Sequence, residues 1–178
     1  LLYPDKQVDM INSMIDIYRE WGWMPKWELF SRETWTMEGD PAIPYITDAY
    51  MRGLRGFDIN EAYKAFRTSA DIDPYIERGY VPMGYYAADM SGDNSVSHAL
   101  EYYLADNALS ILAGELGHKA DAKLFRQRSL GYKHYYSKES GTLRPITMDG
   151  KFLSPFNPED GYDFTNAPGF HEGSAWNY

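Results

Sequence analysis

The chain has 178 residues, of which 44% are hydrophobic, so it is long and apolar enough for one packed domain and is not a disordered chain. Its formal net charge of −9 would be repelled by a phosphate backbone, which argues against a nucleic-acid partner. The lack of Cys excludes disulfides and thiolate metal sites, and no apolar run is long enough to span a membrane.

The first part of the chain alternates helical patterns with long loops. Apolar residues between Pro4 and Gly22 recur every three to four positions, which predicts a helix. Pro41 and Pro44 fit the first turn of a later helix, where a missing N–H is tolerated. The predicted elements are helices over 5–21, 41–51 and 58–67, a loop over 23–39, and a loop over 71–94.

The second part predicts the longest helix, over 95–117, followed after very few residues by another over 120–136. Two helices joined so closely should be antiparallel neighbours. The apolar stripe expected on the first is Val96, Leu100, Tyr103, Leu104, Ala108, Ile111 and Leu112. The inward residues expected on the second are Ala122, Phe125, Ser129, Tyr132 and Tyr136. Asp149-Gly150 predicts the turn of a small β-hairpin near 142–153.

These elements favour an all-α fold class, an incomplete (α/α)6 toroid of helical hairpins with long loops and one small β-hairpin. No repeat of fixed period is present, which argues against a helical solenoid. The chain has no initiator Met and begins within a pattern, so we expect residues 1–178 to be part of one domain, truncated at both ends.

The loop at 23–40 is dense in rings and carboxylates. Rings can stack on sugar faces and carboxylates can bind hydroxyls or move protons, but the same residues could simply pack the loop or be solvated. The residues concerned are Trp23, Trp27, Glu28, Glu33, Trp35, Glu38 and Asp40. On the helix over 95–117, Glu101 and Asp106 could face the ring centre or hold packing contacts.

A second candidate is Glu172, which follows Pro168-Gly169 where a new helix begins. A helix N-terminus favours an ionised carboxylate, so a general acid there needs burial or a neighbouring carboxylate to raise its pKa. The alternative is that Glu172 only serves the helix N-terminus. The four His residues form no HxxxH or HExxH pair, and serine-hydrolase, dinucleotide and NTPase motifs are absent from the sequence.

Several ordered strings resemble family 92 of the glycoside hydrolases, the bacterial exo-α-mannosidases. The order and spacing of the runs carry the resemblance, which covers almost the whole chain. The runs are GWMPKWEL at 22–29, MEGDPAIPYITDAY at 37–50, RG and GFD between 52 and 58, YVP at 80–82, SVSHALEYYLA at 95–105 and EGSAWNY at 172–178.

The resemblance implies a piece of the (α/α)6 catalytic domain that follows an N-terminal β-sandwich. It implies a calcium-dependent, inverting exo-α-mannosidase acting on N-glycans or related mannosides, secreted, periplasmic or on the cell surface. Its partners would be the mannose-containing glycan and the rest of the polypeptide. The glutamate that opens the family's EGxAW motif, the general acid, falls on Glu172. The catalytic base lies in a downstream aspartate motif beyond this sequence, so the isolated piece should be inactive.

The residues expected to bind substrate are Trp23, Trp27, Glu28, Glu33, Asp40 and Trp176, and Asn177, where many members have Gln, is the expected calcium ligand. Three alternatives stay open. Another (α/α)6 glycosidase could act on α-glucosides or trehalose, without calcium. A helical toroid could also bind glycans or serve as a scaffold without chemistry, and a helical protein–protein adaptor is the third.

Overall fold

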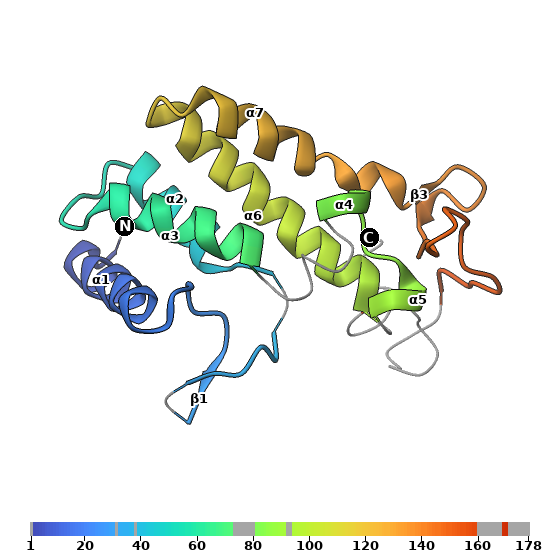
Figure 1. Cartoon of the computed structure of the whole chain (residues 1–178), viewed down its shortest axis with the longest axis horizontal. Coiled ribbons are helices and arrows are strands. Elements are labelled where there is room, and N and C mark those ends of the chain that lie inside the picture. Colours follow the sequence, from blue (N-terminus) through green and yellow to red (C-terminus); the bar gives the residue numbers. More distant parts are fainter. Residues whose placement is uncertain are drawn as a thin grey trace.

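The computed structural model describes residues 2–30, 32–37, 39–72, 81–91, 94–159 and 169–170, and this part of the chain is mainly helical (Figure 1). Its helices are α1 (Pro4–Trp21), α2 (Ala42–Met51), α3 (Ile59–Ile72), α4 (Val81–Met83), α5 (Ala88–Ser91), α6 (Ser95–Glu115), α7 (Lys119–Arg128) and the 3₁₀ helix η3 (Gly131–His134). Two antiparallel strand pairs join β1 (Glu28–Leu29) to β2 (Arg32–Glu33) and β3 (Tyr136–Ser137) to β4 (Thr142–Leu143). The predicted all-α class is confirmed.

Local signals determine where α1 begins and ends. Pro4 opens the helix, where its missing N–H leaves no intrahelical bond unmade. Gly22 closes it in the left-handed region, at φ 87°, and donates its N–H to the carbonyl of Tyr18. Ile11 and Ile15, one turn apart, are fully buried. The helix predicted over 5–21 is therefore confirmed.

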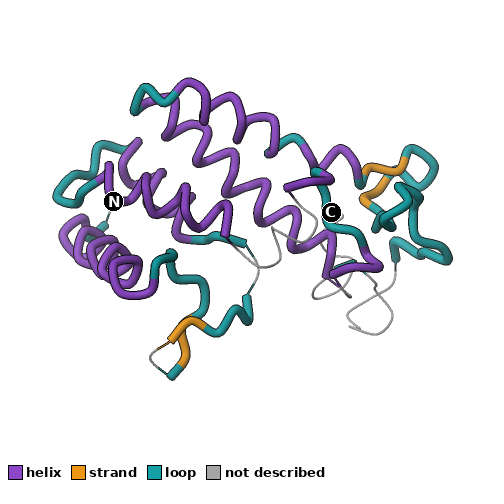
Figure 2. Tube along the Cα trace, viewed as in Figure 1, coloured by secondary structure: helices purple, strands orange, loops and turns teal. Residues whose placement is uncertain are grey.

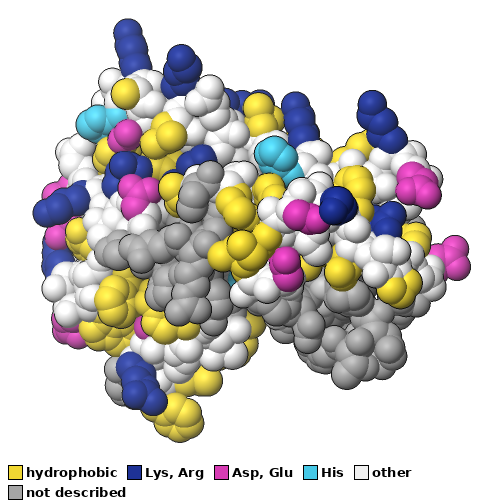
Figure 3. Space-filling model, turned by 45° about the vertical axis from the view of Figure 1, so that its right-hand side comes forward, with side chains coloured by type: hydrophobic (Ala, Val, Ile, Leu, Met, Phe, Trp, Pro, Cys, Tyr) yellow, Lys and Arg dark blue, Asp and Glu magenta, His cyan; other side chains and the backbone are white. Residues whose placement is uncertain are grey.

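Helix α6 is the centre of the described structure, because it packs against α2, α3 and α7. Helices α6 and α7 run side by side, joined by only three residues, as predicted for antiparallel neighbours (Figures 1 and 2). Lys and Arg side chains project along the upper edge in Figure 3, where α7 lies in Figure 1, so α7 presents its polar face to solvent.

The predicted apolar stripe of α6 is only partly correct. Leu104 and Ile111 are 55% and 47% exposed, whereas Ala105 and Leu109 are buried. A helix that is covered from several sides has no single core face, so periodicity cannot identify which apolar residues are inside.

The helix predicted over 120–136 ends earlier, at Arg128, and continues as η3. Gly131 lies against the ring of Tyr103, so close that a Cβ there would be 2.4 Å from a ring carbon. Because α7 ends before this contact, the residues after it do not follow the spacing of an α-helix. Tyr132 and Tyr136 are 42% and 51% exposed and not inward as predicted, whereas Phe125 and Ser129 are buried.

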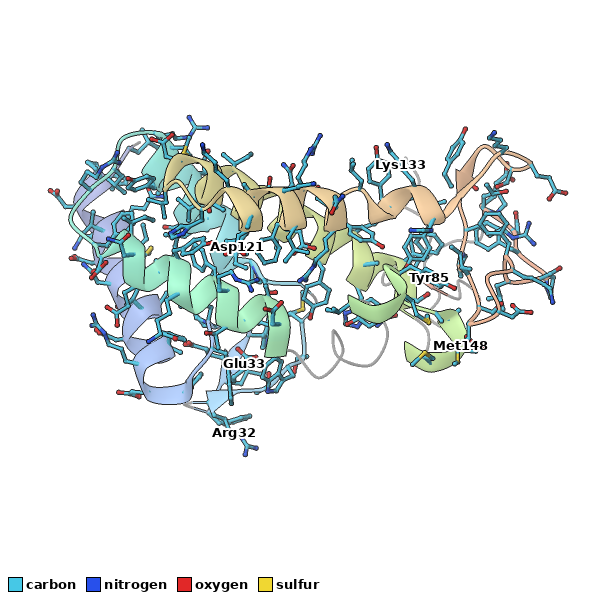
Figure 4. All side chains as sticks on the ribbon, turned by 45° about the horizontal axis from the view of Figure 1, so that its top comes forward. Arg32, Glu33, Tyr85, Asp121, Lys133 and Met148 are labelled. Atoms are coloured by element: carbon cyan, nitrogen blue, oxygen red, sulfur yellow. The ribbon has the colours of Figure 1, made fainter. Side chains whose placement is uncertain are left out.

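Two small β-structures complete the description. Around the predicted hairpin near 142–153, Ile146 pairs with Phe152 across a turn in which Gly150 donates its N–H to the carbonyl of Thr147. The β1–β2 hairpin was not predicted, because residues 23–39 have no regular period. In Figure 4 Arg32 points away from the protein, whereas Glu33 lies on the inner side of the hairpin.

The buried side chains form two clusters along α6. The larger one joins α1, α2 and α3 to the C-terminal half of α6 and to Phe125. The smaller one surrounds the N-terminal half of α6 and contains Tyr86, Tyr102, Tyr103, Tyr135, Ile146 and Phe170. Among the described residues, no helix is both long and apolar enough to cross a membrane.

Candidate active site

The loop between α1 and α2 is folded around the carboxylate of Glu33. This side chain is buried. It accepts hydrogen bonds from the backbone N–H groups of Lys26 at 2.6 Å, Trp27 at 3.1 Å, Thr34 at 2.9 Å and Trp35 at 2.8 Å. Charge-assisted bonds of this kind are strong, so they fix the path of the loop. In the described structure Glu33 therefore holds the backbone of the candidate site in place. Its role in substrate binding stays a prediction.

A buried ion pair connects this loop to α6. The Nζ of Lys26 lies 3.3 Å from Oδ1 of Asp40 and donates a hydrogen bond of 2.8 Å to the hydroxyl of Tyr102. The same Nζ lies 4.8 Å from the ring centroid of Tyr102 and 5.2 Å from that of Trp35. Both charged side chains are 2% exposed. Since a buried charge must be compensated, this cluster fixes Asp40 beside the N-terminal half of α6.

The sequence interpretation included Asp40 but missed Lys26 and Tyr102. A lysine is usually exposed, and only its place between Pro25 and Trp27 in an aromatic-rich run hinted at burial. Tyr102 faces the loop because its hydroxyl and ring contact Lys26, which the sequence pattern of the helix does not indicate.

Trp23 and Trp35 form an aromatic pair in the same loop. Their ring centroids are 5.3 Å apart and their planes are inclined by 49°. Both rings are half-buried, so they present apolar surface next to the Lys26 cluster. This arrangement can stack on the C–H face of a sugar.

The two acids of α6 have different environments. Asp106 is buried and forms an ion pair of 3.1 Å with Arg128, which ties α6 to the end of α7. Glu101 is half-buried, and burial raises the pKa of its carboxyl. Gly39, at φ 76°, lies directly over Glu101, because a Cβ on Gly39 would be 2.5 Å from the Cβ of Glu101. Glu101 therefore belongs to the loop–helix contact and Asp106 to helix packing.

Trp27 and Glu28 face a different surface. They line an open, mainly apolar groove of about 790 Å³ between the hairpin, α1 and α2, together with Met14 and Tyr45. Trp27 is 44% exposed. The described structure thus brings Trp23, Asp40 and Glu33 into one loop–helix contact and leaves Trp27 and Glu28 on the groove beside it. Their substrate-binding role stays a prediction.

The segment that leads to Glu172 is attached to the first turn of α6. The backbone N–H groups of Val96 and Ser97 both donate to the carbonyl of Gly169, at 2.8 and 3.2 Å. Phe170 is 1% exposed and packs in the cluster that contains Tyr102. Glu38, Glu172, Trp176 and Asn177 lie outside the described residues.

The described residues do not provide a complete metal site. Over the ranges given above, no group of three or more His, Asp and Glu side chains comes close enough to hold a metal ion.

Comparison with known proteins agrees with this arrangement. A profile of the glycosyl hydrolase family 92 catalytic domain matches residues 1–178. The family GH92 alpha-mannosidase BT3965 from Bacteroides thetaiotaomicron is similar in structure, with a TM-score of 0.86 and 29% identity over 96% of this chain and 22% of that one. The inverting mannosidase BT2199 from the same organism has a TM-score of 0.86 and 24% identity over 98% of this chain and 24% of that one.

An uncharacterized secreted glycosidase from Arthroderma benhamiae is 26% identical in an alignment of 169 residues that covers 84% of this chain and 21% of that protein. The chain thus spans about a fifth of the length of these relatives. The structural likeness confirms the predicted architecture, an incomplete (α/α)6 toroid.

Proposed function

Because the chain belongs to glycosyl hydrolase family 92, we propose that the complete protein is an exo-acting α-mannosidase that releases terminal mannose with inversion. The observation that carries the proposal is the attachment of Gly169 and Phe170 to the N-terminal half of α6, beside the Lys26 cluster. Glu172 is only two residues after Phe170, and two residues of extended chain span at most about 7 Å. The chain length therefore keeps Glu172 near this contact.

Glu172 is the proposed general acid. In an inverting glycosidase one carboxylic acid protonates the leaving oxygen, and a second carboxylate, about 6.5–9.5 Å away, activates water from the opposite face. The second carboxylate comes from a later part of the polypeptide. Partial burial beside Trp176 would raise the pKa of Glu172, as an acid that donates at neutral pH requires. Trp23 would form the wall on which the sugar lies, and the buried pair of Asp40 and Lys26 would hold that wall in place.

Calcium is the proposed cofactor, with Asn177 as one ligand. Calcium binds carbonyl, carboxylate and hydroxyl oxygens, so it would supply a hard positive centre for mannose hydroxyls. Among the described residues no group of three or more possible ligands comes together, and further ligands would join Asn177 to complete the site.

The rest of the polypeptide is itself a proposed partner. The remaining barrel helices would complete the ring that α1 to α7 begin. A β-sandwich domain would precede this ring in the polypeptide. A secreted, periplasmic or cell-surface location is proposed as well, and the relative named as a secreted glycosidase supports it.

The direct test is an assay of the complete protein on 4-nitrophenyl glycosides, with and without EDTA. The α-mannoside should be hydrolysed, the first product seen by proton NMR should be β-mannose, and EDTA should abolish a rate that calcium restores. Hydrolysis of the α-glucoside that EDTA leaves unchanged would support another (α/α)6 glycosidase. Mannoside binding without hydrolysis would support a glycan-binding protein.

A further inference from the structure

Glu101 is an acidic side chain of the candidate site to which the described structure gives no structural partner. Glu33 accepts backbone N–H groups, Asp40 pairs with Lys26, and Asp106 pairs with Arg128. Within the described residues Glu101 makes no hydrogen bond or ion pair, although its side chain is half-buried. Burial penalises the charge of this half-buried carboxylate, so the contact of its stem with the loop does not explain why the residue is acidic.

The position of Glu101 points to a ligand. It lies on α6 one residue before Tyr102, whose hydroxyl accepts the hydrogen bond from Lys26. The backbone of Gly39 covers the stem of Glu101, and a Cβ at position 39 would lie 2.5 Å from its Cβ but 3.4 Å from Oε2. The loop thus holds the stem of Glu101 in place at Gly39, the residue before Asp40, which pairs with Lys26.

We infer that the Glu101 carboxylate accepts hydrogen bonds from hydroxyls of the bound sugar, as a specificity-determining residue of the active site proposed above, on which this inference rests. A carboxylate is an acceptor with two oxygens, so it can receive two neighbouring hydroxyls at once. Because Lys26, a buried cation of this loop, is already paired with Asp40, the site favours a neutral hexose over a phosphorylated or acidic sugar.

The test uses the complete protein carrying Glu172→Gln, titrated calorimetrically with methyl α-mannoside. Adding Glu101→Gln keeps the shape and removes the charge, and it should weaken binding by about 10-fold or more, as expected for a lost bond to a charged acceptor. Glu115→Gln, on the exposed last turn of the same helix, is the matched control and should leave the affinity unchanged.

Thermal unfolding without sugar separates binding from structure. Because the charge is penalised by burial, Glu101→Gln should raise the melting temperature at neutral pH while it weakens binding. An unchanged affinity, or a lower melting temperature together with lower affinity, would overturn the inference. If the Glu172→Gln parent binds no mannoside, the proposed function fails instead, and if it retains wild-type turnover, only the assignment of the acid fails.

Discussion

Replacing Gly39 by alanine tests the contact between the loop and α6. An L-residue in the left-handed region costs about 1–2 kcal/mol, and Gly39 has φ 76°. The new Cβ would also lie 2.5 Å from the Cβ of Glu101, and overpacking of this kind costs about 1–3 kcal/mol. We expect Gly39→Ala to lower the free energy of unfolding by about 2–5 kcal/mol.

Gly22→Ala is the matched control, because Gly22 has φ 87° and a Cβ there would meet nothing within 4 Å. It should cost only the backbone strain, about 1–2 kcal/mol. Urea unfolding of the complete protein measures both variants, with hydrogen exchange of α6 peptides identifying the relevant transition. Glu101→Ala keeps the colliding Cβ and should not rescue Gly39→Ala. Equal losses for Gly39→Ala and Gly22→Ala would refute the close approach of loop and helix.

Three further predictions concern the charges of the site. Lys26→Met should lower the free energy of unfolding in urea by about 3–5 kcal/mol, because it removes the cation that is paired with the buried Asp40. Adding Asp40→Asn should recover part of this loss. An unchanged free energy of unfolding in Lys26→Met would contradict the buried pair. Glu33→Gln should cost about 1.5–3 kcal/mol by weakening its bonds to the loop backbone, whereas Glu28→Gln, on the exposed strand, should be neutral; equal effects would count against the loop anchor. Burial raises the pKa of Glu101 above its ordinary 4.5, so the folded state binds this proton more tightly than the unfolded state. Thermal scans should therefore show the wild type gaining stability relative to Glu101→Gln as the pH falls through the raised pKa toward 4.5; a constant difference would contradict it.

The sequence could predict the features that depend on near neighbours. Pro4 and Gly22 mark the two ends of α1, and both act within their own turn of helix. The end of α7 could not be predicted in this way, because it depends on the packing of Gly131 against Tyr103, a residue of another helix. The β1–β2 hairpin was missed for a related reason, since its shape depends on the hydrogen bonds that Glu33 accepts from the loop backbone and not on an alternating pattern.

The same limit applies to the candidate site. Trp23 and Asp40 could be predicted from the density of rings and carboxylates in one loop. Lys26 could not, because its burial depends on Tyr102, 76 residues away in the sequence. A pattern can thus indicate which loop carries the chemistry, while the pairing of charges inside it follows from how the loop meets α6.

The most direct test of the central claim is the rate of Glu172→Gln in the complete protein on two mannosides that differ in leaving group. A general acid matters most when the leaving group is poor, so hydrolysis of methyl α-mannoside should fall about 10²–10⁴-fold. Hydrolysis of 2,4-dinitrophenyl α-mannoside, whose leaving group needs little protonation, should fall far less. Wild-type rates on the methyl mannoside would contradict the assignment of Glu172 as the proton donor.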